Sequence, residues 1–198
     1  CSSNKVIEEP VPVRNPLALV REAADEGNQY YLDGEFDASI IAFEKAVTLF
    51  EEAASLASEA DSISLNIENM RLNIAKSFSD HAISLNNNAK HAEAVLKFEN
   101  ALRVYSSLVP VKIADEVLNE NIRALYNNLA IATKNAGQFA KSLTYYDRIL
   151  AQDPKNVEAL NAKFFILSKE LNDDEKAFSV LAEYARVSQD PSAYIMLG

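Results

Sequence analysis

The stretch from Ala124 to Pro154 constrains the fold more than any other part of the chain, because small and large side chains recur in it at helical spacings. Its typed positions are Tyr126, Leu129-Ala130, Gly137, Ser142, Tyr146 and Pro154. Two antiparallel helices approach closely only where one presents a small residue and the other a large one, so we expect Ala130 to leave room that Tyr126 and Tyr146 fill. Gly137 is expected to end the first helix in the left-handed conformation. Pro154 is expected to end the second.

This pattern resembles one tetratricopeptide repeat (TPR), a helix-turn-helix unit of 34 residues. The stretch itself lies in a repeat at 123–156, and similar patterns lie at 20–53, 75–108 and 157–190, with the start of a fifth at 191–198. The resemblance implies an all-α fold, a TPR-like α-solenoid of antiparallel helix pairs that bury their faces against neighbouring pairs. We therefore expect one TPR-like domain over residues 16–198, after a flexible N-terminal tether over residues 1–15 whose alternating prolines and charges do not favour packing.

Two of the helical hairpins are predicted to be longer than in a standard repeat. The aromatic residues of successive second helices, Phe43, Phe98 and Tyr146, are 55 and 48 positions apart. The excess over a period of 34 is 21 and 14, which are multiples of seven and keep each apolar stripe nearly in phase. We expect the turns that connect the two helices of these hairpins near Ser58 to Ser62 and near Leu108 to Val111.

The composition fits an all-helical protein and gives no sign of nucleic-acid binding. The chain has few Gly and Pro residues, no Trp, and a formal charge of −10. Binding to phosphate requires a basic face, so nucleic acid is not an expected partner. The segment from Cys1 to Ser62 carries most of the negative charge, either as a solvated acidic surface or as a patch for a basic partner.

The first residues resemble the start of a mature bacterial lipoprotein. Cys1 is followed by Ser-Ser-Asn and a proline-bearing stretch. The resemblance implies lipidation at Cys1 and a location on the bacterial cell envelope, facing the periplasm, with the outer membrane favoured by the serine at the second position. The alternative is that a cysteine begins the sequence by accident. No apolar run reaches the roughly 18 residues of a membrane helix, so the lipid would be the only membrane anchor.

No catalytic or metal-binding motif is found in the sequence. His81 and His91 are ten residues apart and belong to no metal-ligand pattern. The acidic pairs are typical of surface charges and helix ends. We expect no catalytic residues, no metal and no cofactor, and therefore not an enzyme.

A binding surface is the more promising kind of site. In the TPR family the first helix of each repeat lines a concave groove, one residue round from its packing positions. Applied here, that rule selects Ala24, Asn28, Tyr31, Ser79, Ile83, Asn86, Asn127, Ile131, Lys134, Asn161, Phe165 and Ser168. Ile83, Ile131 and Phe165 would form an apolar row flanked by amides, suited to an extended peptide or a partner helix. Another helix of this chain or a second copy could instead cover the row, so self-association is left open.

These features predict a non-enzymatic scaffold for protein–protein interactions, acting as a periplasm-facing lipoprotein adaptor with a protein or peptide partner. The alternative is a ligand-binding accessory of a transport system, with a pocket or pore in the repeat array. An enclosed apolar cavity would favour that alternative over an open groove.

Overall fold

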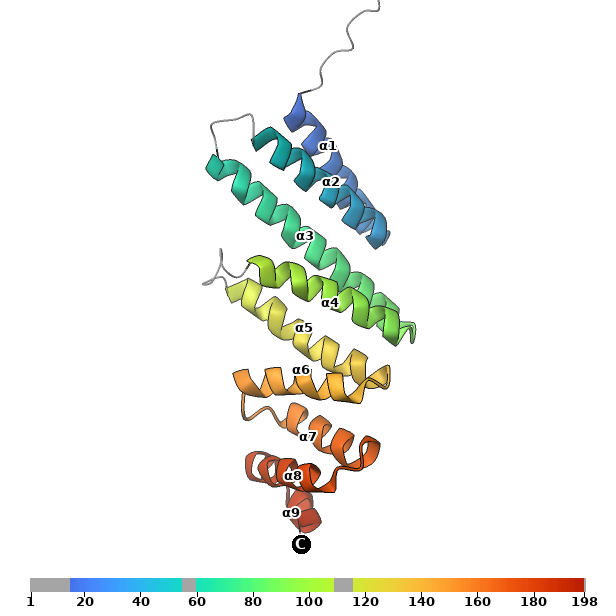
Figure 1. Cartoon of the computed structure of the whole chain (residues 1–198), viewed down its shortest axis with the longest axis vertical. Helices are drawn as coiled ribbons and strands as arrows, with labels where there is room; N and C mark the ends of the chain where they lie inside the picture. Colours follow the sequence, from blue (N-terminus) through green and yellow to red (C-terminus); the bar gives the residue numbers. More distant parts are fainter. Residues whose placement is uncertain (1–14, 55–59, 109–115, 198) are drawn as a thin grey trace, which may run out of the picture.

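The chain is described by a computed structural model over residues 15–54, 60–108 and 116–197. This part of the chain is helical and contains no strand. Its helices are α1 (Pro16–Leu32), α2 (Phe36–Ala54), α3 (Ala60–Asn87), α4 (His91–Leu108), α5 (Glu116–Asn135), α6 (Phe139–Gln152), α7 (Val157–Phe165), α8 (Asp174–Ser188) and α9 (Pro191–Leu197). They are stacked in chain order along the long axis, with α1 at one end and α9 at the other (Figure 1).

Each helix packs against the next one in sequence, which makes the array a solenoid of antiparallel helix pairs. The predicted all-α solenoid is therefore confirmed. Ala130, which was expected to leave room at a helix crossing, is fully buried, and so is Ala94 of the preceding repeat. Phe98 is buried in the same core cluster as Ala94, and Tyr146 in the same cluster as Ala130, so small and large residues alternate across the interfaces as predicted.

The turn inside each helix pair uses one residue in the left-handed conformation. These residues are Gly34, Ala89, Gly137 and Asn172, with φ angles of 76°, 58°, 73° and 52°. In each of the first three pairs the turn residue lies seven residues after a closely packed residue of the first helix, which is Gly27, Ala82 or Ala130. The fourth pair has one residue more between Phe164 and Asn172, and the π-helical turn Ile166–Glu170 lies in this interval.

A buried serine marks the equivalent crossing in two of the pairs. Ser39 Oγ donates to the Gly27 carbonyl at 2.9 Å, and Ser142 Oγ donates to the Ala130 carbonyl at 2.7 Å. Both serines are fully buried and follow their acceptors by twelve residues. The hydrogen bond satisfies a hydroxyl that would otherwise be costly to bury, so the two pairs share their geometry as well as their sequence pattern.

The helices α2 to α5 form the two hairpins that the sequence predicted to be extended. The helices α2, α3, α4 and α5 have 19, 28, 18 and 20 residues, compared with 14 for α6. In the first hairpin Ile67 and Met70 of α3 pack against the buried cluster of Val20 and Phe50. Of the predicted turn from Ser58 to Ser62, the first two residues lie outside the described residues and the other three already belong to α3, so the predicted turn extends three residues too far. Of the second turn, Leu108 is the last residue of α4, and the rest lies outside the described residues.

Candidate functional site

The surface formed by α1, α3, α5 and α7, which we call the first-helix face, carries the predicted groove residues. Ile83, Ile131 and Phe165 are exposed on it, with 40%, 43% and 51% of their surface accessible. Each follows directly after a buried packing residue of its helix, which is Ala82, Ala130 or Phe164. The three side chains therefore occupy the same position in successive repeats, and no helix of the described chain covers them.

The polar groove residues differ in how freely they face solvent. Asn28, Asn127 and Lys134 are exposed, whereas Tyr31, Ser79, Asn86, Asn161 and Ser168 are half-buried. Asn86 Oδ1 lies 2.8 Å from His91 Nδ1, so this amide helps to close the α3–α4 turn. The prediction for Ala24 was wrong: its side chain is buried beside Ala46 of α2, because a small residue is needed where α1 and α2 cross.

A hollow of about 330 Å³ opens on the first-helix face between α3 and α5, above the buried ring of Tyr105 from α4. Ser79 and Ile83 line it, as the groove prediction implies. Sequence reasoning missed its other polar lining residues, which are Lys76, Asp80, Asn121 and Asn128. Lys76 precedes Ser79 by three residues and Asp80 precedes Ile83 by three residues, a spacing that could have indicated both, since such residues share one side of a helix.

Tyr31, Asp80 and Lys76 form a polar cluster that joins α1 to α3 beside this hollow. The Tyr31 hydroxyl donates a hydrogen bond to the Asp80 carboxylate, and Lys76 Nζ lies 4.8 Å from the centre of the Tyr31 ring. Burial, and then this hydrogen bond, raises the pKa of Tyr31 above its ordinary value. Burial also raises the pKa of Tyr105 to about 12. Both phenols are therefore neutral near pH 7 and can donate hydrogen bonds.

The remaining predicted features concern metals, membranes and Cys1. Within the described ranges no group of three or more His, Cys, Asp or Glu residues could hold a metal ion. His81 Nδ1 lies 3.2 Å from Asp37 Oδ1 without hydrogen-bond alignment, and Lys97 also pairs with that carboxylate. None of the helices described is both long and apolar enough to cross a membrane. Residues 1–14 of the predicted tether, Cys1 included, lie outside the described residues, so lipidation stays a prediction. The last residue of the predicted tether, Asn15, caps α1 by accepting a hydrogen bond from the Leu17 amide.

Comparison with known proteins finds likeness at the level of structure. No protein-family model matches the sequence, and no match is found among curated proteins. A solved structure of YrrB, described as a TPR protein with an unusual peptide-binding site, is 15% identical, covers 91% of this chain and 96% of its own, and has a TM-score of 0.47. The MamA protein is 13% identical over 89% of this chain and 95% of its own, with a TM-score of 0.45. BtubC from P. vanneervenii is 15% identical over 92% of this chain and 81% of its own, with a TM-score of 0.48.

These overlaps are too loose to support an argument about ligands or partners. The geometry that decides the fold lies in the chain itself, in the left-handed turn residues and the small-to-large crossings that recur from pair to pair. The fold is an all-α solenoid of TPR-like helix pairs. Its helix pairs place Ile83, Ile131 and Phe165 on one surface, and the proposed function is argued from that surface.

Proposed function

We propose that the chain is an interaction scaffold whose first-helix face binds a polypeptide segment of a partner protein. The observation that carries this proposal is the repeated exposure of Ile83, Ile131 and Phe165 at equivalent positions of three first helices. Removing exposed apolar side chains from water favours association at roughly 25 cal/mol per Å² of apolar surface. A row of such residues suits a segment that crosses several repeats, as in groove-binding proteins.

The polar groups on the same face supply the other half of a peptide site. The exposed amide of Asn127 precedes Ile131 by one helical turn, and the half-buried amide of Asn161 stands in the same relation to Phe165. Amides can both donate to and accept from a peptide backbone. The hollow beside Ile83 is large enough to receive a side chain of the bound segment. Its charged lining by Lys76 and Asp80 would select among segments.

The transport alternative requires an enclosed apolar cavity. The hollow between α3 and α5 opens to solvent and is lined partly by charged residues, so it does not favour that alternative. The envelope location expected from the N-terminal sequence does not bear on how the face binds, and it stays a separate prediction.

The proposal is tested by comparing Ile131→Asp and Phe165→Asp with Ile41→Asp as a matched control. Ile41 is 65% exposed, lies on α2, and is not part of the first-helix face. A photo-crosslinking residue in place of Asn127 would identify the bound partner in extracts of the native host. We expect the crosslinked partner to be retained by Ile41→Asp and lost by both first-helix variants, with helicity unchanged by circular dichroism. Undiminished crosslinking in both first-helix variants would contradict the proposal.

A further inference from the structure

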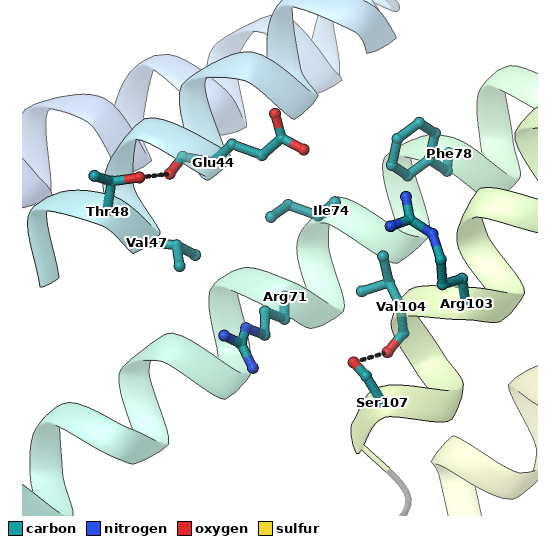
Figure 2. A pocket seen from close by; sticks show the side chains of 9 residues that line it. All are labelled: Glu44, Val47, Thr48, Arg71, Ile74, Phe78, Arg103, Val104 and Ser107. Carbon is teal, nitrogen blue, oxygen red and sulfur yellow. Dashed lines mark hydrogen bonds between the residues drawn. The ribbon is translucent and has the colours of Figure 1, made fainter. Parts of the chain in front are cut away.

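A second hollow, of about 290 Å³, lies between α2, α3 and α4 (Figure 2). It faces away from the first-helix face. On α3 it is lined by Arg71, Ile74 and Phe78, whereas Lys76, Ser79 and Ile83 line the hollow described above. At about 100° per residue the two sets point to opposite sides of one helix. A ligand in this second hollow would therefore not compete with a segment on the first-helix face.

The hollow combines two guanidinium groups with an apolar floor. In Figure 2, Arg71 projects from α3 and Arg103 from α4, and their guanidinium groups lie toward opposite ends with Ile74 and Val104 between them. Val47 of α2 adds to the apolar lining. A ligand that lies across the hollow therefore meets a positive charge, then an apolar surface, and then a second positive charge.

The guanidinium groups have unused donors. Arg103 contacts Asn100 Oδ1 at 3.3 Å and forms no ion pair with the described residues. Arg71 contacts Glu51 Oε1 at 3.3 Å through one nitrogen. Because a guanidinium carries five N–H donors, both groups can bind a further carboxylate.

The other polar groups of the hollow add no further donor. Thr48 Oγ1 donates to the Glu44 carbonyl at 3.1 Å, and Ser107 Oγ donates to the Val104 carbonyl at 2.6 Å. The Glu44 carboxylate also lines the hollow and is without an ion pair among the described residues. A carboxylate accepts hydrogen bonds, so it favours a ligand that brings N–H groups as well as negative charge, as a peptide does and inorganic phosphate does not.

We infer that this hollow is a second binding site, which takes an extended acidic peptide segment with an apolar residue between two acidic ones. In an extended chain alternate side chains point to the same face. Three such side chains can therefore meet Arg71, the floor at Ile74 and Val104, and Arg103. The chain as a whole has a charge of −10 and repels acidic ligands at long range. An acidic segment held here is therefore selected by the local arginines.

The experiment uses the full chain and fluorescein-labelled peptides with the core Glu-Ser-Leu-Ser-Glu between glycines, followed by fluorescence anisotropy at about 0.15 M salt, where the long-range repulsion is screened. Two matched peptides replace both Glu with Gln, or Leu with Ser. We expect the Gln peptide to bind at least about tenfold more weakly, as the loss of a charge-assisted contact implies. The Ser peptide is also expected to bind more weakly, since it leaves the apolar floor exposed to water.

Protein variants locate the site. Arg103→Gln should weaken binding of the Glu peptide by about tenfold or more, and Arg71→Gln should weaken it less, because Arg71 already has Glu51 as a partner. The exposed Arg148 of α6 provides the control, and Arg148→Gln should bind as the parent does. Ile131→Asp should also leave this binding unchanged, so a failure of this proposal is distinct from a failure of the first-helix site.

Three results would overturn the inference. The first is equal affinity for the Glu and Gln peptides, or no binding of the Glu peptide up to millimolar concentration. The second is an Arg103→Gln variant that binds like the parent while circular dichroism shows an intact fold. The third is displacement of the peptide by inorganic phosphate at equal concentration, which would define a general anion site.

Discussion

Gly27 offers a test of the small-to-large packing on which the solenoid depends. It is a buried residue inside α1, and its carbonyl accepts a hydrogen bond from the Ser39 hydroxyl. A Cβ atom added at this position would lie 2.8 Å from both Cδ1 and Cε1 of Phe43. Carbon atoms pack best at about 3.5 to 4.0 Å, so the added methyl group would be too close by about 0.7 Å or more. Phe43 is only 1% exposed, so its ring cannot swing out into solvent without disturbing the surrounding core.

Two opposing effects decide the outcome of Gly27→Ala. Alanine is favoured over glycine inside a helix by about 1 kcal/mol. Overpacking of a tight core costs about 1 to 3 kcal/mol. Because the close contact at Gly27 is with a buried ring, we expect the overpacking cost to be larger and the free energy of unfolding to fall by about 1 to 2 kcal/mol. For a chain of this size the melting temperature falls by about 2 to 4 °C for each kcal/mol.

A double-mutant cycle separates the two effects. Urea unfolding is followed by circular dichroism for the parent, Gly27→Ala, Phe43→Leu and the double variant. In the Phe43→Leu background the contact is relieved while the gain in helix propensity remains, so Gly27→Ala should there be neutral or stabilising. Ala130 occupies the equivalent slot of the third repeat and provides a control, since Ala130→Gly should lower stability by about 1 kcal/mol. A Gly27→Ala chain more stable than the parent, or an equal effect in both backgrounds, would refute the reasoning.

Other residues give further predictions. Ala89 has a φ of 58°, so Ala89→Gly should raise the free energy of unfolding by roughly 0.5 to 1 kcal/mol in urea titrations. Gly137 has a φ of 73°, so Gly137→Ala should lower the free energy of unfolding by roughly 1 to 2 kcal/mol. The reverse order of the two variants would contradict the role of the left-handed turn. Phe50 is buried against Val20, Ile67 and Met70, so Phe50→Ala should cost about 3 kcal/mol as a core truncation, and a near-neutral result in the same assay would mean that the extended hairpin is not packed. Burial raises the pKa of Tyr105 to about 12, above the value of about 10 in an unfolded chain. The folded state then holds a proton that the unfolded chain loses, so this contribution is complete below about pH 10 and is lost as the pH rises toward about 12. Tyr105→Phe should therefore show a shallower alkaline loss of stability in urea titrations at a series of pH values, and an unchanged slope would contradict the assignment.

The parts of the fold that depend on local pattern could be predicted from sequence. Gly34 and Gly137 mark turns because only the left-handed conformation closes them, and this requirement acts on single residues. Ala89 and Asn172 occupy the same turn position without being glycine, so their place could be inferred only from the spacing of the repeats. The π-helical turn after Phe165 was not predicted, because one extra residue in a helix leaves no clear mark in the apolar pattern.

Of the two candidate binding sites, the first could be predicted in part from the sequence, whereas the hollows could not. The sequence by itself placed Ile83, Ile131 and Phe165 on one face, since the position of a side chain around a helix follows from counting residues. The two hollows were decided by tertiary structure alone. They exist where helices from different repeats diverge, and they bring together residues as far apart in sequence as Glu44 and Arg103. Helical periodicity fixes which way each side chain points, but the space left between packed helices depends on the sizes of all the side chains at their crossings.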